Sequence, residues 1–149
     1  FTKANADSEG RIINRLIDEY AEVNDNITAF ASLGMIKYLS ALKYCSMVIG
    51  NSSSGLIEAP SFGIPTVNIG DRQKGRIEAG SVINCQPAQE EIKKAIDIAL
   101  SDSFIKKSKQ AVNPYGNGNT SDKVINVIKE FVLNDKIDLK KKFYDCGVE

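Results

Sequence analysis

Residues 47–58 read Met47-Val48-Ile49-Gly50-Asn51-Ser52-Ser53-Ser54-Gly55-Leu56-Ile57-Glu58 and combine an apolar run with a polar, glycine-flanked one. Its apolar start predicts a buried strand, and the glycines and hydroxyls that follow predict a short polar loop at the start of a helix. Glycine lets a backbone approach a ligand closely, serine donates hydrogen bonds, and a helix N-terminus favours negative charge. The stretch therefore predicts an anion pocket whose natural occupant is a phosphate or a diphosphate. Serines before a helix are also common as simple N-caps, so that alternative stays open.

A basic loop follows the next predicted strand. Residues 65–70 read Pro-Thr-Val-Asn-Ile-Gly and lead into Asp71-Arg72-Gln73-Lys74-Gly75-Arg76. Ligands of open α/β sheets bind beyond the carboxyl ends of the strands, so we expect the hydroxyl loop and the basic loop at the same edge of a sheet. The two loops together suit an anionic ligand better than either does alone. A solvated basic loop is the alternative, and it fits Lys74 better than Arg72.

Hydrophobic periodicity predicts the remaining elements. We expect the end of a strand within residues 1–7, and strands at 26–30, 46–49, 65–69 and 81–85. We expect helices at 8–22, after Ser32, at 55–62 with an interruption at Pro60 and a stop at Gly63, at 89–100, at 104–110 and after Thr120. The apolar residues expected to face inward are Ile12, Ile13, Leu16, Ile17 and Tyr20, then Met35, Ile36, Leu39 and Leu42, then Ile92, Ala95, Ile96, Ala99 and Leu100, and finally Val124, Ile125, Ile128, Phe131 and Val132. Strands that alternate with helices imply an α/β, Rossmann-like parallel sheet with helices on both faces.

Composition limits the function further. The 149 residues are enough for one domain with a core, and no apolar stretch approaches the length of a bilayer span. The chain holds 19 basic and 19 acidic residues, so zero net charge gives no electrostatic reason to expect nucleic acid or an anionic membrane as a partner. Histidine is absent, which excludes a Ser-His-Asp triad and histidine metal ligands within this chain. We expect neither a metal nor another cofactor.

The cysteines indicate the compartment of the protein, and the first residue bears on its length. Cys45, Cys85 and Cys146 are far apart and lack Cys-x-x-Cys spacing. We therefore expect reduced, structural thiols in a cytoplasmic protein. The chain begins at Phe1 rather than methionine, and we expect it to be the C-terminal part of a longer protein.

Six stretches agree in order and spacing with one known family. They are Asn5-Ala6-Asp7, Ile49-Gly50-Asn51-Ser52-Ser53-Ser54-Gly55, Glu58-Ala59-Pro60, Gly63-Ile64-Pro65-Thr66-Val67-Asn68-Ile69-Gly70, Arg72-Gln73 with Gly75-Arg76, and Pro114-Tyr115-Gly116-Asn117-Gly118. Together they resemble the C-terminal domain of the UDP-N-acetylglucosamine 2-epimerases, from the first residues to about residue 133. The basic loop and the closing Lys141-Lys142-Phe143-Tyr144-Asp145 are similar to the hydrolysing branch of that family.

The resemblance implies a fold and a set of binding residues. The fold would be the C-terminal half of a GT-B arrangement, in which two Rossmann-like domains face a cleft. Residues 1–133 would form the nucleotide-binding domain and residues 134–149 a charged tail. Ser52, Ser53 and Arg72 match positions at the UDP diphosphate, and Glu58 matches the carboxylate that holds the ribose hydroxyls. Further candidates are Asn51, Ser54, Gly55, Asn5, Asp7 and Tyr115.

Plain structural roles remain open for several of these residues. Glu58 would also fit as a solvated glutamate in a first helical turn, and Tyr115 would also fit as loop packing. Asn5 and Asp7 would also serve as turn and cap residues.

The resemblance further implies an activity. A hydrolysing family member converts UDP-N-acetylglucosamine to N-acetylmannosamine and UDP, for the synthesis of sialic-acid-type sugars. The acid–base carboxylates would lie on a missing N-terminal domain, so no catalytic residue is assigned in this chain. We expect the full-length protein to be a homo-oligomer. The alternatives are the same chemistry on UDP-diacetylbacillosamine, a GT-B glycosyltransferase domain, and a non-catalytic nucleotide-binding module.

Overall fold

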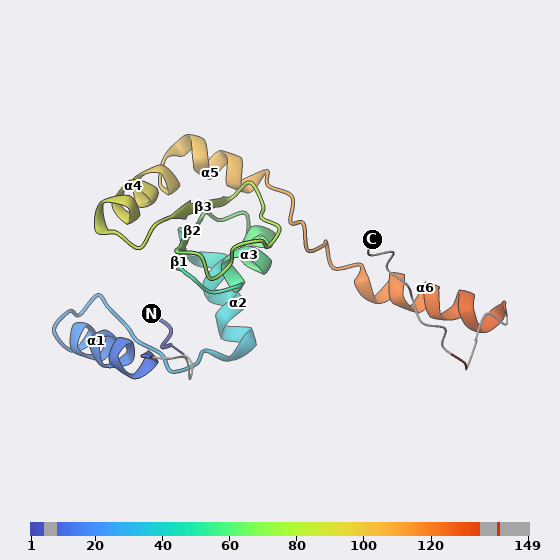
Figure 1. The fold of residues 1–149 in the computed structure, drawn as a ribbon, viewed down its shortest axis with the longest axis horizontal. Coiled ribbons are helices and arrows are strands. Elements are labelled where there is room, and N and C mark those ends of the chain that lie inside the picture. Colours follow the sequence, from blue (N-terminus) through green and yellow to red (C-terminus); the bar gives the residue numbers. More distant parts are fainter. Residues whose placement is uncertain (5–8, 135–139, 141–149) are drawn as a thin grey trace, which may run out of the picture.

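The computed structural model describes residues 1–4, 9–134 and 140, and these form an α/β arrangement around a small parallel sheet (Figure 1). The strands are β1 (Val48–Gly50), β2 (Thr66–Ile69) and β3 (Val82–Cys85), in the order β1-β2-β3. Both pairs are parallel, with Gly50 opposite Asn68 and Ile69 opposite Cys85. The predicted α/β, Rossmann-like class and the predicted strands at 46–49, 65–69 and 81–85 are therefore confirmed.

Helices cover both faces of the sheet. On one face α4 (Gln89–Ala99) packs against β2 and β3, and α5 (Asp102–Lys109) follows it. On the other face lie α3 (Ser54–Ile57) and the 3-10 helix η1 (Ala59–Phe62), with α2 (Gly34–Tyr44) against η1. The core on the α4 side consists of Val67, Ala95 and Ala99, with Met47, Ile69, Ile83 and Cys85 packed around it.

The central strand β2 alternates in the way that two covered faces require. Val67 faces α4, whereas Thr66 faces α3 and donates a 2.9 Å hydrogen bond from its hydroxyl to the carbonyl of Gly55. Both side chains are buried. A Cβ on Gly55 would lie only 2.7 Å from Cγ2 of Thr66, so glycine allows α3 to approach the strand this closely.

The predicted helix at 55–62 is divided. Pro60 stands in the first turn of η1, and Gly63 ends η1 in the left-handed conformation with a φ of 64°. The interruption and the stop agree with the prediction. The α-helical part holds only 4 residues, which leaves little of the helix dipole that the sequence suggested at the serines.

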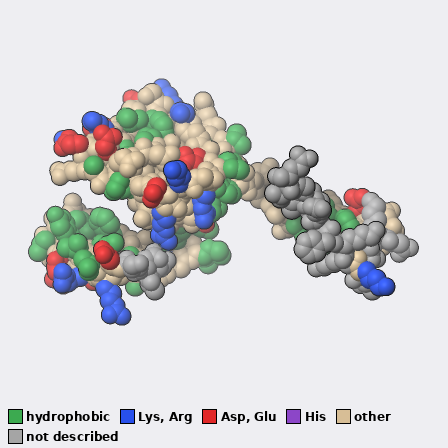
Figure 2. All heavy atoms as spheres, viewed as in Figure 1, with side chains coloured by type: hydrophobic (Ala, Val, Ile, Leu, Met, Phe, Trp, Pro, Cys, Tyr) green, Lys and Arg blue, Asp and Glu red, His purple; other side chains and the backbone are tan. Residues whose placement is uncertain are grey.

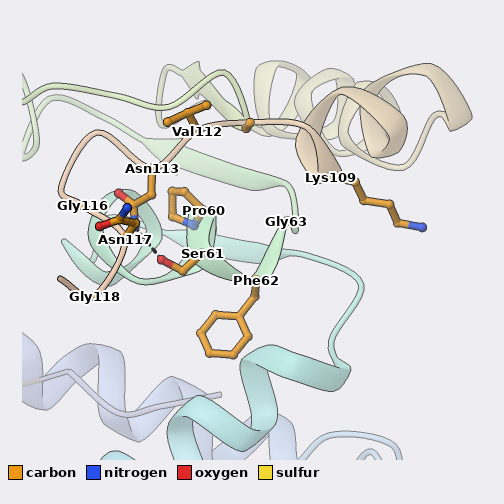
Figure 3. A pocket seen from close by; sticks show the side chains of 11 residues that line it. Pro60, Ser61, Phe62, Gly63, Lys109, Val112, Asn113, Gly116, Asn117 and Gly118 are labelled. Carbon is orange, nitrogen blue, oxygen red and sulfur yellow. Dashed lines mark hydrogen bonds between the residues drawn. The ribbon is translucent and has the colours of Figure 1, made fainter.

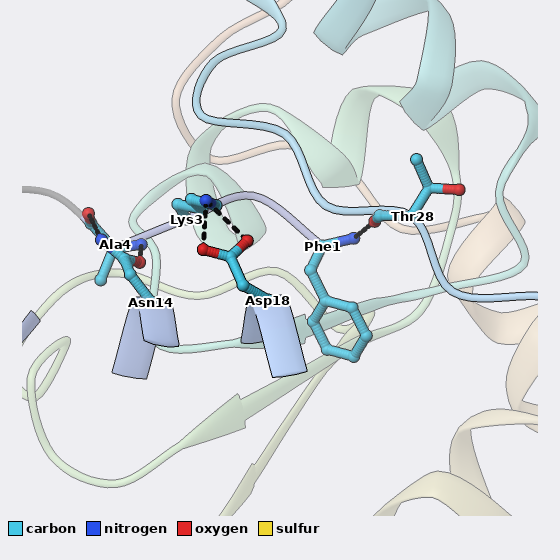
Figure 4. Close-up of polar contacts among 6 residues, drawn as sticks. All are labelled: Phe1, Lys3, Ala4, Asn14, Asp18 and Thr28. Carbon is cyan, nitrogen blue, oxygen red and sulfur yellow. Dashed lines mark hydrogen bonds and ion pairs between the residues drawn. The ribbon is translucent and has the colours of Figure 1, made fainter. Parts of the chain in front are cut away.

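The N-terminal segment is tied to α1 (Gly10–Glu22) by polar contacts (Figure 4). Lys3 forms an ion pair with Asp18 at 2.7 Å. The amide of Asn14 accepts a 2.7 Å bond from the N–H of Ala4 and donates a 3.1 Å bond back to its carbonyl. The predicted strand end within residues 1–7 and the predicted strand at 26–30 reduce to one parallel bridge between Thr2 and Phe30. The prediction of a strand at 26–30 is therefore wrong, and the strand end predicted within residues 1–7 is limited to this bridge among the described residues, because two short segments paired with each other make a marginal ladder.

Several apolar helix faces are not buried by the described residues. Ile12, Ile13 and Leu16 of α1 are about half exposed, and Figure 2 shows hydrophobic side chains gathered over that helix. Met35 and Ile36 at the start of α2 are exposed, although Leu42 is buried. The helix α6 (Thr120–Leu133) stands apart from the sheet at the end of an extended segment, and each of its residues is exposed.

The inward faces predicted for α6 and the start of α2 are therefore wrong for the described chain, and on α1 Ile17 is the one residue of the predicted face that is partly buried among the described residues. Periodicity finds an amphipathic helix but cannot say which surface covers it. For α4 the prediction is largely confirmed, since Ala95 and Ala99 are buried, whereas Leu100 is 46% exposed.

We expect Gly55→Ala to lower the free energy of unfolding by about 1–3 kcal/mol, because the added methyl group forces α3 away from Thr66. Urea unfolding of the two chains measures the difference. Gly80→Ala is the matched control, since its Cβ would meet the Cε atom of Lys107 at an ordinary 3.5 Å. Equal stability of Gly55→Ala and the unaltered chain would contradict the role given to this close approach.

Candidate functional site

A cleft of about 840 Å³ opens at the carboxyl edge of the sheet. Its walls come from the N-terminal segment, α1 and α2, and its floor comes from the end of β1 and the loop that follows. The cleft is lined by five residues that the sequence analysis singled out: Asn51, Ser52, Ser54, Glu58 and Arg72. Ligand sites of parallel α/β sheets lie at this edge.

The serine loop, defined here as residues 51–54, is reached through a backbone turn at Gly50. The φ of Gly50 is 143°, a value that favours glycine, and nothing lies where a Cβ would be. The Ser52 hydroxyl accepts a long 3.4 Å bond from the N–H of Ser54. Ser53 occupies the N-cap position of α3, but its side chain makes no capping bond. A simple N-cap therefore does not explain the hydroxyl of Ser53.

The hydroxyl of Ser54, the last serine of this loop, is bonded to a residue of α2. The hydroxyls of Tyr38 and Ser54 form a hydrogen bond, and both residues line the cleft. Tyr38 was not among the residues that the sequence suggested, because it lies on a helix with an ordinary amphipathic pattern. Ser53 is not among the lining residues, and Gly55, which lies within α3, is buried against Thr66 of β2. The structure thus brings Ser52 and Ser54, rather than Ser53, to the cleft wall.

Glu58 offers a buried acceptor at the same cleft. The residue follows α3 directly, which places it one turn beyond the serine loop. Its Oε2 atom is buried and has no hydrogen-bond partner within the described part of the chain. An unpartnered buried carboxylate oxygen is costly. A pair of ligand hydroxyls would satisfy it.

The arginine loop, defined here as residues 71–76, leaves the neighbouring strand β2. Arg72 is exposed and lines the cleft, whereas Lys74 and Arg76 are exposed and do not line it. Gln73 is only 3% exposed, and its Nε2 donates a 2.7 Å bond to the carbonyl of Asn51 in the serine loop. The two loops are therefore in direct contact, and they lie at the same edge of the sheet, as the sequence predicts.

A row of side-chain hydrogen bonds, from two amides to a carboxylate, connects the sheet to the segment that follows the arginine loop. Asn68 of β2 donates a 2.7 Å bond to the side-chain oxygen of Asn84 on β3, its ladder partner. Asn84 in turn donates a 2.7 Å bond to Glu78, which follows the arginine loop. Asn68 is 2% exposed, so this row ties the loop to the interior of the sheet.

Tyr115 forms a hydrogen bond to the segment that follows the arginine loop. Its hydroxyl donates a 3.1 Å bond to the carbonyl of Ile77, just beyond the arginine loop. Asn113 donates to the carbonyl of Ile57 at 2.8 Å and to the Ser61 hydroxyl at 2.7 Å. Tyr115 does not line the cleft, so the geometry gives it a tethering role. Asn5 and Asp7 lie outside the described residues, and so does the charged tail apart from Asn134 and Lys140.

A second groove of about 670 Å³ lies between η1 and the segment that leads to α6 (Figure 3). It is lined by Pro60, Gly63, Asn113 and Asn117 among others, and Lys109 is its one charged lining residue. In Figure 3 the Lys109 side chain points away from the groove. The groove therefore offers an anion far less than the cleft at Arg72 does.

The described cysteines behave as structural thiols. Cys45 and Cys85 are free and partly buried, and Cys85 packs against the core. Burial raises the pKa of both thiols, and the charge of Glu91 adds to this for Cys85. In the described ranges, no group of three or more His, Cys, Asp and Glu residues is placed to hold a metal ion. None of the helices in those ranges has the length and apolar character needed to cross a membrane.

A family model described as UDP-N-acetylglucosamine 2-epimerase matches residues 1–129. The "Polysialic acid biosynthesis protein P7" of Escherichia coli is 37% identical over 145 residues, which is 97% of this chain and 37% of that protein. The "GDP/UDP-N,N'-diacetylbacillosamine 2-epimerase (hydrolyzing)" of Campylobacter jejuni is 47% identical over 87 residues, which is 58% of this chain and 23% of that protein.

A solved structure described as a UDP-N-acetylglucosamine 2-epimerase superposes with a TM-score of 0.69 at 20% identity. The match covers 97% of this chain and 38% of the solved chain. At this identity the likeness shows the fold alone. The chain thus spans well under half the length of the proteins that it matches.

We expect Tyr115→Phe to raise the rate of tryptic cleavage after Arg72, Lys74 and Arg76 about twofold to fivefold, because it removes the bond to Ile77. Limited proteolysis followed by mass spectrometry measures cleavage at each site. Tyr20→Phe is the matched control, since Tyr20 is exposed and distant in sequence from the loop. Unchanged cleavage in Tyr115→Phe would show that the loop does not depend on this tether.

Proposed function

Because the chain belongs to the UDP-N-acetylglucosamine 2-epimerase family, we propose that it supplies the UDP-binding part of a hydrolysing 2-epimerase. The full-length enzyme would convert UDP-N-acetylglucosamine to N-acetylmannosamine and UDP for the synthesis of sialic-acid-type sugars. One observation carries the proposal: a single cleft is lined by serine hydroxyls, an arginine and a glutamate with a buried, unpartnered oxygen.

These residues match the chemistry of UDP group by group. The diphosphate needs several donors, which the serine loop and Arg72 supply, and the planar guanidinium fits two phosphate oxygens. The ribose needs an acceptor for its vicinal hydroxyls, which Glu58 supplies. In this proposal Ser52 and Arg72 bind the diphosphate from the cleft wall, and Ser53 binds it from the adjoining N-cap position of α3, where its hydroxyl makes no capping bond. Glu58 binds the ribose, with Asn51, Ser54 and Gly55 shaping the loop.

The proposed reaction makes UDP a leaving group. A base removes the proton at C2 of the sugar, the C1–O bond breaks, and the electron pair leaves with UDP. Water then adds to the resulting glycal to give free N-acetylmannosamine. Negative charge grows on the departing phosphate, so donors aimed at that phosphate stabilise the transition state. The chain would contribute to catalysis in this way without moving a proton.

We place the acid–base groups in a further part of the enzyme. Glu58 is the only carboxylate among the described residues that line the cleft, and the ribose occupies it in this proposal. The chain covers 37% of the Escherichia coli relative, which leaves room for a second domain that closes over the sugar. Residues 1–133 then form the nucleotide-binding domain, and the 149 residues alone release no sugar.

A related sugar is the second candidate substrate. The Campylobacter jejuni relative, at 47% identity over 87 residues, is named for diacetylbacillosamine rather than N-acetylglucosamine. The two sugars differ at positions that the nucleotide-binding cleft does not contact in this proposal. Assay of the full-length enzyme with both UDP-sugars, with detection of the free sugar, decides between them.

We expect Arg72→Ala in the full-length enzyme to weaken UDP binding by about 1.5–3 kcal/mol, the value of a hydrogen bond to a charged group. Calorimetric titration with UDP measures the loss. Arg76→Ala is the matched control, because it removes the same charge from the same loop at a position outside the cleft. Equal losses in the two variants would point to net charge rather than a contact of Arg72.

We expect Glu58→Ala to weaken the binding of UDP more than that of 2′-deoxy-UDP, because only the first ligand offers both ribose hydroxyls to the carboxylate. Loss of a hydrogen bond to a charged group corresponds to about 1.5–3 kcal/mol. Titration of the full-length enzyme with each nucleotide gives the difference. If the substitution weakens both ligands equally, Glu58 does not read the 2′-hydroxyl.

A further inference from the structure

We propose that Gln73 is a positioning residue that sets the spacing between the serine loop and the arginine loop, and so assembles the diphosphate site before the ligand arrives. The inference rests on the proposed function and deepens it. Gln73 does not line the cleft, so it would act through the residues beside it rather than by contact with the ligand.

The hydrogen bond of Gln73 joins the serine loop to the arginine loop beyond the last paired residues of β1 and β2. The β1–β2 ladder ends where Gly50 lies opposite Asn68. Beyond that point the Nε2 atom of Gln73 donates a 2.7 Å bond to the carbonyl of Asn51. The assignment of the amide is clear, because a carbonyl accepts and only the NH₂ end of the side chain donates.

This bond lies next in sequence to the residues proposed to bind the diphosphate, so it bears on the spacing between them. Gln73 directly follows Arg72, and Asn51 directly precedes Ser52. The bond therefore links the residue just after Arg72 to the residue just before Ser52, next to both proposed phosphate contacts. A site for a diphosphate depends on such spacing, since a displacement of about 1 Å in a binding group can cost up to roughly a hundredfold in function.

Stability alone does not explain a glutamine here. Gln73 is 3% exposed, and its Oε1 atom is buried without a partner among the residues that the structure describes. A half-satisfied buried amide is no more stable than an apolar side chain of the same shape, and is often less stable. We therefore assign the amide to loop positioning.

The test compares Gln73→Met with the unaltered 149-residue chain. Methionine keeps the length and the burial of the side chain but donates no hydrogen bond. Titrations with UDP and with uridine, followed by NMR, give an affinity ratio that isolates the contribution of the diphosphate. We expect Gln73→Met to lower this ratio about tenfold, while the urea midpoint stays near that of the unaltered chain.

Gln86→Met is the matched control. Gln86 follows β3 at the same edge of the sheet, is exposed and does not line the cleft, so both the ratio and the urea midpoint should remain unchanged. A second measurement needs no variant: the side-chain NH₂ protons of Gln73 should exchange with solvent more slowly than those of Gln86.

The outcomes separate the inference from the proposed function. If the unaltered chain binds UDP and Gln73→Met keeps the same ratio, the positioning role is overturned and the proposed function stands. Equal weakening of UDP and uridine, a Gln73→Met chain that does not fold, or NH₂ exchange as fast as that of Gln86 would each overturn it too. If the unaltered chain binds no UDP, the proposed function falls, and this inference falls with it.

Discussion

Parallel pairing of β1 with β2 is the constraint on which the rest of the site depends. Parallel strands bring their carboxyl ends to the same edge, so the loops that follow Gly50 and Ile69 emerge side by side. The helices α3 and η1 and the strand β2 separate the serine loop from the arginine loop in sequence, but the two loops share a hydrogen bond between Gln73 and Asn51.

Close packing beneath the cleft sets the position of the serine loop. The absent Cβ of Gly55 lets α3 lie against Thr66, and the Thr66 hydroxyl fixes the carbonyl of Gly55. This contact decides where Ser54 and Glu58 stand relative to β2. Because α3 has only 4 residues, the proposed diphosphate site relies on directed side chains and backbone groups rather than on a helix dipole.

The sequence predicts the centre of the fold and of the site well. Apolar runs with glycine or proline at their ends predict all three strands, and the two polar loops at their carboxyl ends predict where the cleft forms. The periodic helices are found as well, but not their partners. Val124 and Phe131 lie on an apolar stripe of α6 that no pattern within the chain could show to be exposed.

Two contributions to the site could not be predicted. Tyr38 and Gln73 bond to the serine loop across 16 and 22 residues of sequence. Tyr38 belongs to no motif, and although Gln73 lies in the predicted basic loop, no local pattern shows which of its side chains bonds to the serine loop. Tyr115 illustrates the reverse case. Its place between proline and glycine suggests a functional loop, and the structure gives it a tether to Ile77. Long-range hydrogen bonds of this kind depend on the tertiary fold, which local pattern does not specify.

The central claim is that a nucleoside diphosphate binds at the cleft between the serine loop and the arginine loop. The most direct test is titration of the ¹⁵N-labelled chain with UDP, followed by NMR of the backbone amides. We expect saturable shifts concentrated at residues 51–58 and 71–73, with a dissociation constant of roughly millimolar order, because few contacts offset the cost of association. Shifts concentrated instead at residues 61–63 and 112–118, around the second groove, or no saturable shifts at all, would contradict it.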